Sequence, residues 1–476
     1  MAEQSANRLQ YAGEYTLEGL ELRTVRGNFN ITRNYVQLDL FENIFSNSIS
    51  GSLVIADTNN LIVNVPFIGQ EFLRLKISTP GISGVDAIDY QQNYFVVYKV
   101  GFVQDISKGT QLIELHFTTQ EALLNQRVRV SKSYSQDNLH EIVEDVLVSG
   151  AYLDSRKYVF LEKAKNLQRI VSPNLHPFDL IAMCSSQAQS SSSSTDPDIN
   201  YFVFFENTRG YHFKSLSFLY KQPIQGEYNC GDVGTIDRKT EDKENYNRVL
   251  TYNKMGSINM LENIVGGVLG STLTTHDIYN KKYEEYSHGY FDSYPRVDEN
   301  PIYLNTAVGY SGRNVGDFAD ARIYLNSRSG ENSNKSFSRG TNDTGDEGNV
   351  SSLTKGTGLL RRRAKFAELN GGGGTNYNIK VNGHVGMKAG QIINFTVSTV
   401  GNPHGQGSEN KYTSGRYLVT HLRHTFFKAP IVKHEVTMAI TKDSYRTSLP
   451  SGSIETTTRP RGFVTEVTYG GDYGGM

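Results

Sequence analysis

Short segments in which apolar and polar residues alternate constrain this chain more than any other feature. In FLRLKIS, residues 72–78, the leucines and the isoleucine fall on one face, while Arg74 and Lys76 fall on the other. This period of two is that of a strand with one buried and one solvated face. LIELHF repeats the pattern, and NYFVVYKVGFV reads as another strand. We therefore expect residues 20–118 to form an antiparallel barrel or sandwich, whose strand edges must be covered by closure or by a partner.

The composition fits such a chain and narrows its function. Among 476 residues there are 29 tyrosines, 23 phenylalanines, 45 glycines and no tryptophan, a mixture that suits half-buried pleated surfaces joined by tight turns. The length predicts roughly three units of ~150 residues. Lysine and arginine total 48 against 49 acidic residues, a net charge of −1, so the whole chain gives no field for strong binding to nucleic acid.

Cysteine spacing and hydropathy exclude further classes. Cys184 and Cys230 form no CxxC pair, which argues against a disulfide framework or a thiolate zinc site and predicts two buried thiols in a reducing compartment. The N-terminal MAEQSANRLQYAGEY lacks the basic and apolar regions of a signal peptide, and no window approaches the ~18 apolar residues of a membrane span. We expect a soluble chain that inserts into no membrane.

Two segments depart from the strand pattern and predict helices. In SQDNLHEIVEDVLVSG apolar residues recur at helical spacing, with Asp137 or Asn138 as the N-cap. A second helix is expected from Pro177, whose fixed φ suits the first helical position. The serine-rich run at residues 185–198 then predicts a flexible surface loop.

The second half of the chain alternates strand-like segments with polar ones. Residues 201–219 predict a β-hairpin whose turn gives Gly210 a positive φ. From residue 305 to residue 358 a tract rich in Gly, Ser and Asn has too little apolar content to order by itself. A short helix is expected at residues 359–369, and the strand-like segments after it read as the last strands of a second barrel.

Several segments, taken in order, resemble one protein family. They are ISGSLVIAD with Asn60 and Leu61 after it, DNLHEIVEDVL, HPFDLIAM, YFVFFENTRGYHFKSL, KAGQIINFTV, SGRYLVTHLRHTF and HEVTMAITKDSY. No single segment is a fingerprint, but their order over about residues 20–300 and 357–446 is similar to the central hub protein of contractile bacteriophage baseplates. That family is related to late control D proteins and to the N-terminal half of type VI secretion spikes.

The resemblance implies a fold and a role. The fold is α+β and predominantly β, with two tube-like antiparallel β-barrels, inserted helices and a smaller accessory region. Such hubs are homotrimers in which three chains present six similar domains to a sixfold tail tube, while the other end meets a trimeric spike. A ring of three can mate evenly with a ring of six only if each subunit carries two quasi-equivalent surfaces. The resemblance thus implies a symmetry adaptor that encloses a channel for genome passage.

The implied partners are the tail tube protein and the spike protein, with wedge or tape-measure proteins as further candidates and DNA in transit through the lumen. The implied location is the virion tail baseplate, assembled in the host cytoplasm. The expected segments are an N-terminal arm (1–19), a first barrel (20–118 plus 246–290), a second barrel with helices (119–245 plus 376–447), a polar insertion (300–358), a linker helix (359–375) and a C-terminal tail (448–476).

Two clusters are candidates for the subunit interface. Phe41, Ile44 and Phe45 would be core residues in a lone barrel, although in a ring the same residues could cover the sheet edge of a neighbour.

The second cluster is the only dense basic run, and it lies on the expected linker helix. Arg361, Arg362, Arg363 and Lys365 predict a contact between subunits, a solvated face, or a contact to DNA in the lumen.

No chemistry of a catalytic or cofactor site stands out. His421 and His424 are an odd number of residues apart in an expected strand, so they point to opposite faces and are unsuited to sharing a metal. The glycine-rich VGGVLGSTLT lacks the lysine of a phosphate-binding loop and predicts a turn. Glu141 and Glu144 fall on the exposed face of the first helix rather than in a catalytic pair. We expect no cofactor, no metal and no enzymatic activity.

The sequence leaves two other functional classes to consider. A carbohydrate-binding or receptor-binding tail protein would need an exposed aromatic platform, for which YEEYSHGYFDSY, residues 283–294, is the best segment. A tail-associated hydrolase is disfavoured because the sequence offers no carboxylate pair, nucleophile triad or metal cluster.

Overall fold

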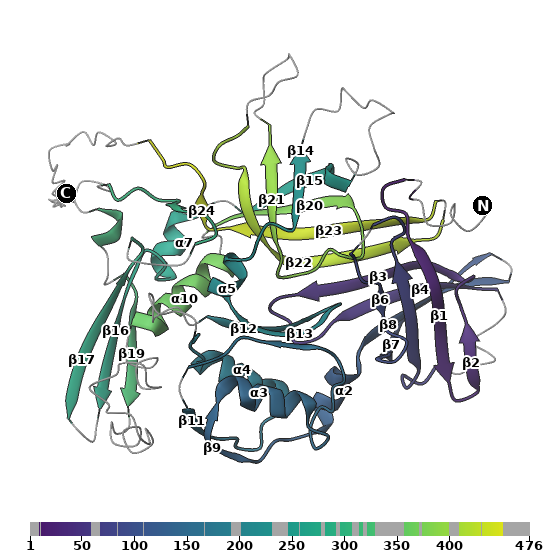
Figure 1. Ribbon diagram of the computed structural model, residues 1–476, viewed down its shortest axis with the longest axis horizontal. Coiled ribbons are helices and arrows are strands. Elements are labelled where there is room, and N and C mark those ends of the chain that lie inside the picture. Colours follow the sequence, from purple (N-terminus) through teal and green to yellow (C-terminus); the bar gives the residue numbers. More distant parts are fainter. Residues whose placement is uncertain are drawn as a thin grey trace, which may run out of the picture.

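Figure 1 shows a computed structural model of the protein, in which strands dominate and a few helices pack below and beside them. The structure describes residues 9 and 11–450 without 59–66, 83, 108, 166, 192–200, 231–245, 257, 278–280, 292–295, 307–313, 318–320, 329–356, 371–373, 399–408 and 430. The predominantly β, α+β class expected from the sequence is confirmed.

The strands fall into an early and a late set along the chain. The early strands are β1 (Thr16–Thr24), β2 (Gly27–Asn30), β3 (Tyr35–Asn43), β4 (Ser50–Asp57), β5 (Phe72–Ser78), β6 (Ile88–Asp89), β7 (Phe95–Ser107), β8 (Thr110–Thr119), β9 (Ser133–Asn138), β10 (Val159–Leu161), β11 (Leu167–Val171), β12 (Phe202–Asn207) and β13 (Gly210–Ser215). The late strands are β14 (Gly226–Cys230), β15 (Val249–Gly256), β16 (Gly270–Asp277), β17 (Lys282–Gly289), β18 (Asn300–Pro301), β19 (Ile323–Arg328), β20 (Thr375–Asn382), β21 (Ile392–Val397), β22 (Gly415–Phe427), β23 (Lys433–Lys442) and β24 (Ser444–Tyr445).

The described helices are α2 (Gln120–Arg127), α3 (Leu139–Val148), α4 (Pro177–Gln187), α5 (Leu216–Tyr220), α7 (Met260–Val265), the 3-10 helix η2 (Val315–Asp317) and α10 (Thr357–Asn370). Of these, α3, α4 and α10 are the longest. None of the helices in the described ranges is long and apolar enough to cross a membrane.

One 14-stranded sheet organises the molecule. Its main path runs β15-β20-β23-β22-β3-β4-β8-β7-β5-β1-β2, with β14, β21 and β6 attached beside this path. We call β1–β8 the first group, and β14, β15 and β20–β23 the second group. Figure 1 shows the second group in teal, green and yellow above the purple and blue strands of the first.

The long strand β22 joins the two groups. Along one edge β22 pairs with β23. Along its other edge, residues 415–418 pair with β21 of the second group, while residues 421–427 pair with β3 of the first group. The register of β22 shifts between Val419 and His421, where its neighbour changes from β21 to β3. A single strand therefore fuses the two groups into one sheet.

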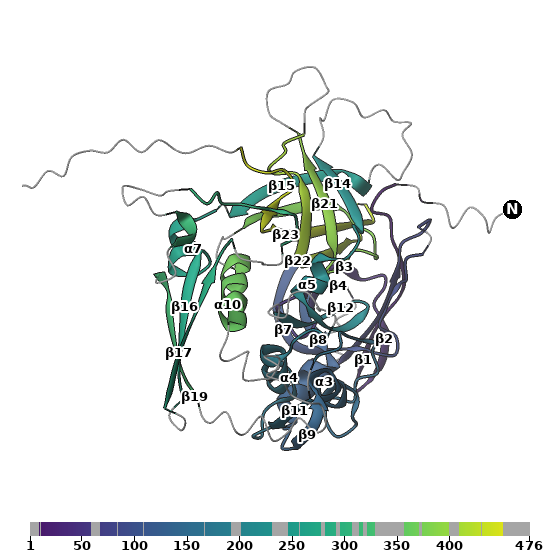
Figure 2. The same ribbon diagram turned by 60° about the vertical axis from the view of Figure 1, so that its left-hand side comes forward.

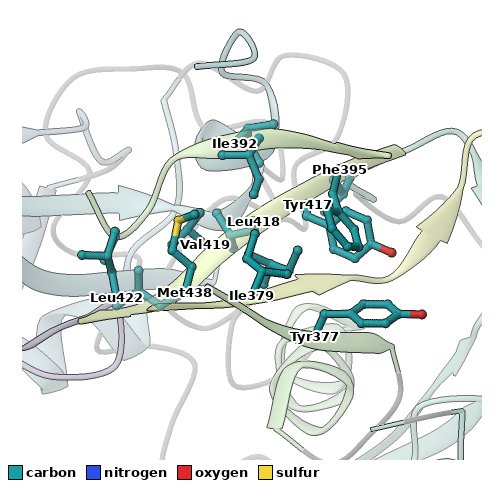
Figure 3. Close-up of a cluster of buried hydrophobic side chains, with 14 of the residues drawn as sticks. Tyr377, Ile379, Ile392, Phe395, Tyr417, Leu418, Val419, Leu422 and Met438 are labelled. Carbon is teal, nitrogen blue, oxygen red and sulfur yellow. The ribbon is translucent and has the colours of Figure 1, made fainter. Parts of the chain in front are cut away.

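Each group encloses its own hydrophobic core. In the first group, Leu73, Leu75 and Ile77 of β5 are fully buried with residues from β1, β3, β4, β7 and β8, as the alternating pattern predicted. Figure 3 shows the core of the second group, where Tyr377 and Phe395 lie close to Tyr417. The apolar face of the sheet thus points inward in both groups and leaves the opposite face to solvent.

A third core lies under the first two, between sheet strands and helices. The hairpin β12–β13, strand β10 and the pair β9–β11 pack against α3 and α4. The helix α3 begins after Asn138, whose backbone N–H donates to the Glu141 carboxylate at 2.9 Å, and α4 begins at Pro177. Both predicted helices and the predicted positive φ of Gly210, 142°, are confirmed.

A smaller sheet stands apart from the main one. Strand β16 pairs with β17 on one side and, in parallel, with β19 on the other, and α7 and α10 pack beside this sheet. Figure 2 shows the β16–β17–β19 sheet and α10 side by side, separate from the strands of the first group.

Several expectations need correction. The sequence predicts that residues 246–290 complete one barrel with residues 20–118. The observed strand pairing differs, because β15 pairs with β20 of the second group, and β16 pairs with β17 and β19. The segment boundaries as such stay predictions. Part of the polar tract forms strand β19, whose residues 323–328 pair in parallel with residues 272–277 of β16. Residues 307–313, 318–320 and 329–356 lie outside the described residues.

Three local boundaries also differ. The predicted serine loop begins with helical residues, because α4 continues to Gln187 before residues 192–200 leave the described part. The second arm of the predicted hairpin ends at Ser215, whose hydroxyl caps α5 by accepting the Phe218 N–H. The described ladders leave the main sheet open at β2 and β15, and only an isolated bridge between Asn229 and Arg248 links β14 to the start of β15.

Candidate assembly surfaces

We call the face of the main sheet that points away from both cores the open face, and most of its side chains are polar. Residues directly opposite each other on neighbouring strands share a face of a sheet. One such row runs from β15 to β1 through Thr251, Lys380, Thr437, Arg423, Phe41, Ser50, Thr118, Val96, Phe72 and Arg23. The row therefore runs across both groups, and Val96 is its one buried member at 2% exposure.

Charges on the open face are largely paired. The Arg423 guanidinium donates to both carboxylate oxygens of Asp39 at 3.0 and 2.9 Å, and its hydrogen bond to Asp39 raises the pKa of Arg423. Lys380 and Lys433 both contact Glu435, at 2.5 and 2.8 Å. Such a surface carries no strong field of either sign.

The structure separates the first predicted interface cluster. Phe41 lies on the open face, 38% exposed, with the Arg423 guanidinium carbon 5.5 Å from its ring centre. Ile44 is fully buried in the second-group core, and Phe45 is partly buried against the same core. Phe41 is therefore exposed and Phe45 partly accessible, whereas Ile44 lies inside the core.

The structure also divides the predicted basic run on α10. The Lys365 side chain is 3% exposed and forms ion pairs with Glu368, at 2.8 Å, and with Asp443. The prediction of a surface role for Lys365 is therefore wrong, because this lysine fastens α10 to the end of β23. Burial raises the pKa of Glu368 to about 7, although Lys365 opposes the shift.

The arginines of α10 contact their own chain. The Arg362 guanidinium donates to the Ser186 carbonyl and lies 5.7 Å from the Tyr201 ring centre, and burial lowers its pKa. Arg363 lies over the Tyr324 ring at 4.4 Å and is exposed. These contacts place α10 against α4 and the small sheet. A role of Arg361, Arg362 and Arg363 between subunits stays a prediction.

Sequence reasoning missed the most informative buried polar groups, which lie in two copies of the tripeptide Phe-Glu-Asn. One copy, residues 41–43, ends β3, and the other, residues 205–207, ends β12. In each copy the asparagine Oδ1 accepts the backbone N–H two residues later, from Phe45 at 2.9 Å and from Arg209 at 3.0 Å. We call these turns the Glu42 corner and the Glu206 corner.

The two glutamates are buried and hold each other's corners. Glu42 accepts the backbone N–H groups of Thr208 and Ala389, each at 2.7 Å, and Thr208 belongs to the Glu206 corner. Glu206 in turn accepts the N–H of Ile49 at 3.1 Å, at the far end of the turn that begins with the Glu42 corner. Burial raises the pKa of both carboxyls. The repeated tripeptide after an apolar run was the signal that could have revealed this reciprocal pair.

The remaining candidates from the sequence have plain structural roles. His421 is exposed and His424 is buried, so they point to opposite faces as predicted, and no cluster of potential metal ligands occurs in the part of the chain that the structure describes. Gly267 takes a φ of 76° in the turn after α7, as expected for that glycine-rich segment. Of the Tyr-rich segment, Tyr283 is exposed but Tyr290 is fully buried, while residues 292–294 lie outside the described residues.

Comparisons with known proteins give likenesses of fold at low identity. No family model and no curated protein matches the chain. A tail protein from Neisseria meningitidis MC58 is 9% identical, with a TM-score of 0.49 over 90% of this chain and 97% of that one. The 43 kDa tail protein of prophage MuSo2 from Shewanella oneidensis is 10% identical, with a TM-score of 0.47 over 91% of this chain and all of that one, 100%.

A third similar structure is a component of the type VI secretion system from E. coli, 10% identical with a TM-score of 0.40 over 93% of this chain and 80% of that one. These proteins are of the phage-tail and type VI class that the sequence segments resemble. Because each TM-score is below 0.5, the likeness by itself assigns neither a fold nor a function to this chain.

Proposed function

We propose that this chain is the structural hub of a contractile phage tail baseplate. In this role three copies join a sixfold tail tube to a trimeric spike and enclose a channel through which the genome passes. The role is structural rather than enzymatic, and its location is the tail baseplate of the virion.

The observation that carries the proposal is the repetition of one buried corner in a single chain. The Glu42 and Glu206 corners share a tripeptide, an asparagine turn and a buried carboxylate that accepts backbone N–H groups. The Glu42 corner ends β3 of the first group, and the Glu206 corner ends β12, whose Val203 and Phe205 pack into the core of the second group. Two similarly built β units in each subunit would let a trimer offer six similar surfaces to a sixfold ring. In this proposal the tube-like barrel of each group is completed in the trimer, where the edge left open in one copy meets its neighbour.

The open edges of the main sheet support a ring of copies. The path ends at β2 and β15, and within the described residues the edge of β15 opposite β20 carries no ladder. Leu250, Tyr252 and Met255 of β15 are exposed. An uncovered, partly apolar edge strand is a site for pairing with another chain. In a ring of three, the β15 edge of one copy would meet the β2 edge of the next.

The open face would then line the channel. Its charges are paired across strands, and small side chains such as Ser50, Thr118 and Thr437 lie between them. A wall of this kind neither repels a polyanion strongly nor holds it, which suits the passage of DNA.

Mass measurement of the purified chain tests the proposal. Native mass spectrometry of the 53.2 kDa chain, alone and with candidate tube and spike proteins, should show species with three copies. Met255→Asp on β15 should abolish them while the circular dichroism spectrum is unchanged. Val171→Asp on β11 is the matched control, since Val171 is 63% and Met255 is 65% exposed. Copies that stay monomeric or dimeric with both candidate partners would overturn the proposal.

A further inference from the structure

A cleft of about 230 Å³ lies between the Glu206 corner, which supplies Phe205, Asn207 and Arg209, and the loop whose Ala389 N–H is accepted by Glu42. Its walls come from the β12–β13 hairpin, α5 and the loop that precedes β21. We call it the basic cleft, because Arg209, Lys214 and Lys388 line it and no acidic side chain does.

The three cations retain capacity for a ligand. The Lys388 ammonium donates to Thr208 Oγ1 at 3.0 Å and to the Val385 carbonyl at 3.2 Å, which leaves a third N–H. Among the residues that the structure describes, neither Arg209 nor Lys214 forms an ion pair within 4 Å of a carboxylate. Burial lowers the pKa of Lys214 and of Lys388, which shows that both ammonium groups are partly stripped of water.

Aromatic rings flank these charges. The Arg209 guanidinium lies 4.8 Å from the centre of the Phe160 ring, and Lys214 Nζ lies 4.1 Å from that of Phe218. His212 stacks between Phe160 and Phe205 at 4.8 and 5.0 Å. Burial, followed by the charges of Lys214, Arg209 and Lys388, lowers the pKa of His212 to about 3, so the histidine is neutral at physiological pH.

The cleft is held in shape without a ligand. Glu42 ties its two walls together by accepting the N–H groups of Thr208 and Ala389. Gln222 Nε2 donates to the Gly390 carbonyl at 3.0 Å, across the same gap. Gly390 has a φ of 85°, and a Cβ there would lie 2.8 Å from Phe205 Cζ. A preformed site of this kind loses little conformational entropy on binding.

A second cleft, lined by Lys157, provides an internal contrast. It measures about 390 Å³, but Glu121 and Asp154 line it together with Arg156 and Lys157. Lys157 is already bound to Glu121 at 2.6 Å and to Glu206 at 2.7 Å. Of the two clefts, only the basic cleft combines desolvated cations with a lining free of carboxylates.

We propose that the basic cleft binds an oxyanion group, a carboxylate or a phosphate, that is carried on a flat apolar body such as an aromatic ring. Charge-assisted hydrogen bonds from Arg209 and Lys388 would hold the oxyanion, and Phe160 and Phe218 would cover the apolar body.

Calorimetric titration of the full chain with four probes tests this site. Benzoate and phenyl phosphate should bind, whereas benzyl alcohol, which lacks the anion, and inorganic phosphate, which lacks the ring, should bind at least tenfold more weakly. The tighter of the two aromatic anions tells which oxyanion the cleft prefers. Because the cleft lies within one chain, this result is independent of whether three copies assemble.

A matched pair of variants tests whether the anions bind in the basic cleft. Arg209→Gln combined with Lys214→Met should weaken binding of both aromatic anions at least tenfold. Lys221→Met, an exposed lysine outside the lining, should leave the affinity unchanged. The proposal fails if benzyl alcohol binds as tightly as benzoate, if the double variant binds like the wild type, or if neither aromatic anion binds at millimolar concentration.

Discussion

The Glu42 and Glu206 corners begin with the same tripeptide but acquire different electrostatic surroundings. Glu206 accepts the Lys157 ammonium at 2.7 Å, and a second acid, Glu121, shares this lysine. Glu42 is satisfied by two backbone N–H groups, while Lys388 donates elsewhere. One corner is thus a closed ion network, and the other leaves its lysine at the wall of a cleft. The comparison teaches that a repeated local structure keeps its geometry while its neighbours decide its chemistry.

The largest expected effect comes from removing the lysine of the closed network. Lys157→Met leaves Glu121 and Glu206 buried without their cation, so we expect the free energy of unfolding to fall by ~3–5 kcal/mol. Lys388→Met at the other corner removes two hydrogen bonds and should cost ~1–2 kcal/mol. Urea unfolding followed by circular dichroism measures both values. Equal losses would show that the two corners do not differ as described.

A smaller loss of stability is expected when the Glu42 side chain can no longer accept both backbone N–H groups. In Glu42→Gln the amide NH₂ cannot accept an N–H, so either Thr208 or Ala389 is left with an unsatisfied buried donor, at ~1–3 kcal/mol. Glu144→Gln, on the exposed face of α3, should change stability by less than ~0.5 kcal/mol. The same unfolding assay applies, and a neutral Glu42→Gln would mean that water replaces the carboxylate.

Acid should act on the basic cleft through His212. Its pKa is lowered to about 3, chiefly by burial and then by Lys214, Arg209 and Lys388, so the unfolded chain takes up a proton near its ordinary pKa of about 6.5 before the folded chain does. The stability that neutral His212 contributes is therefore lost as pH falls from about 6.5 towards about 3, and the free energy of unfolding falls by at most ~1.4 kcal/mol per pH unit. His212→Phe should remove this part of the slope.

The measurement is the free energy of unfolding of wild type and His212→Phe between pH 7 and pH 4.5. His384, His424 and His434, whose pKa values burial also lowers, titrate alike in both proteins and cancel in the difference. Parallel slopes would show that His212 is charged or solvated in the folded protein.

The smallest expected effect distinguishes the two turn asparagines. Asn43 Oδ1 accepts one backbone N–H, so Asn43→Ala should cost ~0.5–1 kcal/mol. Asn207 also contacts His212 Nε2 at 3.0 Å and donates to the Ala389 carbonyl at 3.3 Å, so Asn207→Ala should cost ~1–2 kcal/mol. Thermal unfolding of the two variants measures both losses. A larger loss for Asn43→Ala than for Asn207→Ala would contradict the comparison.

Local patterns in the sequence predicted the elements whose reasons are local. The alternation in β5, the helical spacing in α3, the proline that starts α4 and the turn at Gly210 each follow from a few neighbouring residues. The candidate surfaces were predicted less well. In the sequence, Lys365 lies in a basic run and was therefore assigned to a surface. Its burial depends on ion pairs with Glu368 and Asp443, and Asp443 lies far along the chain, so no local pattern predicts the second pair.

The sequence by itself determined that this chain is built mainly of strands with one apolar face, because the two-residue period depends only on backbone geometry. Only the tertiary structure decided that β22 serves both groups, that β15 pairs with β20, and that two identical tripeptides hold each other's corners. The physical reason is that strand pairing and buried carboxylates take their partners from distant parts of the chain, and no local pattern records which partner a strand edge or a charge will meet.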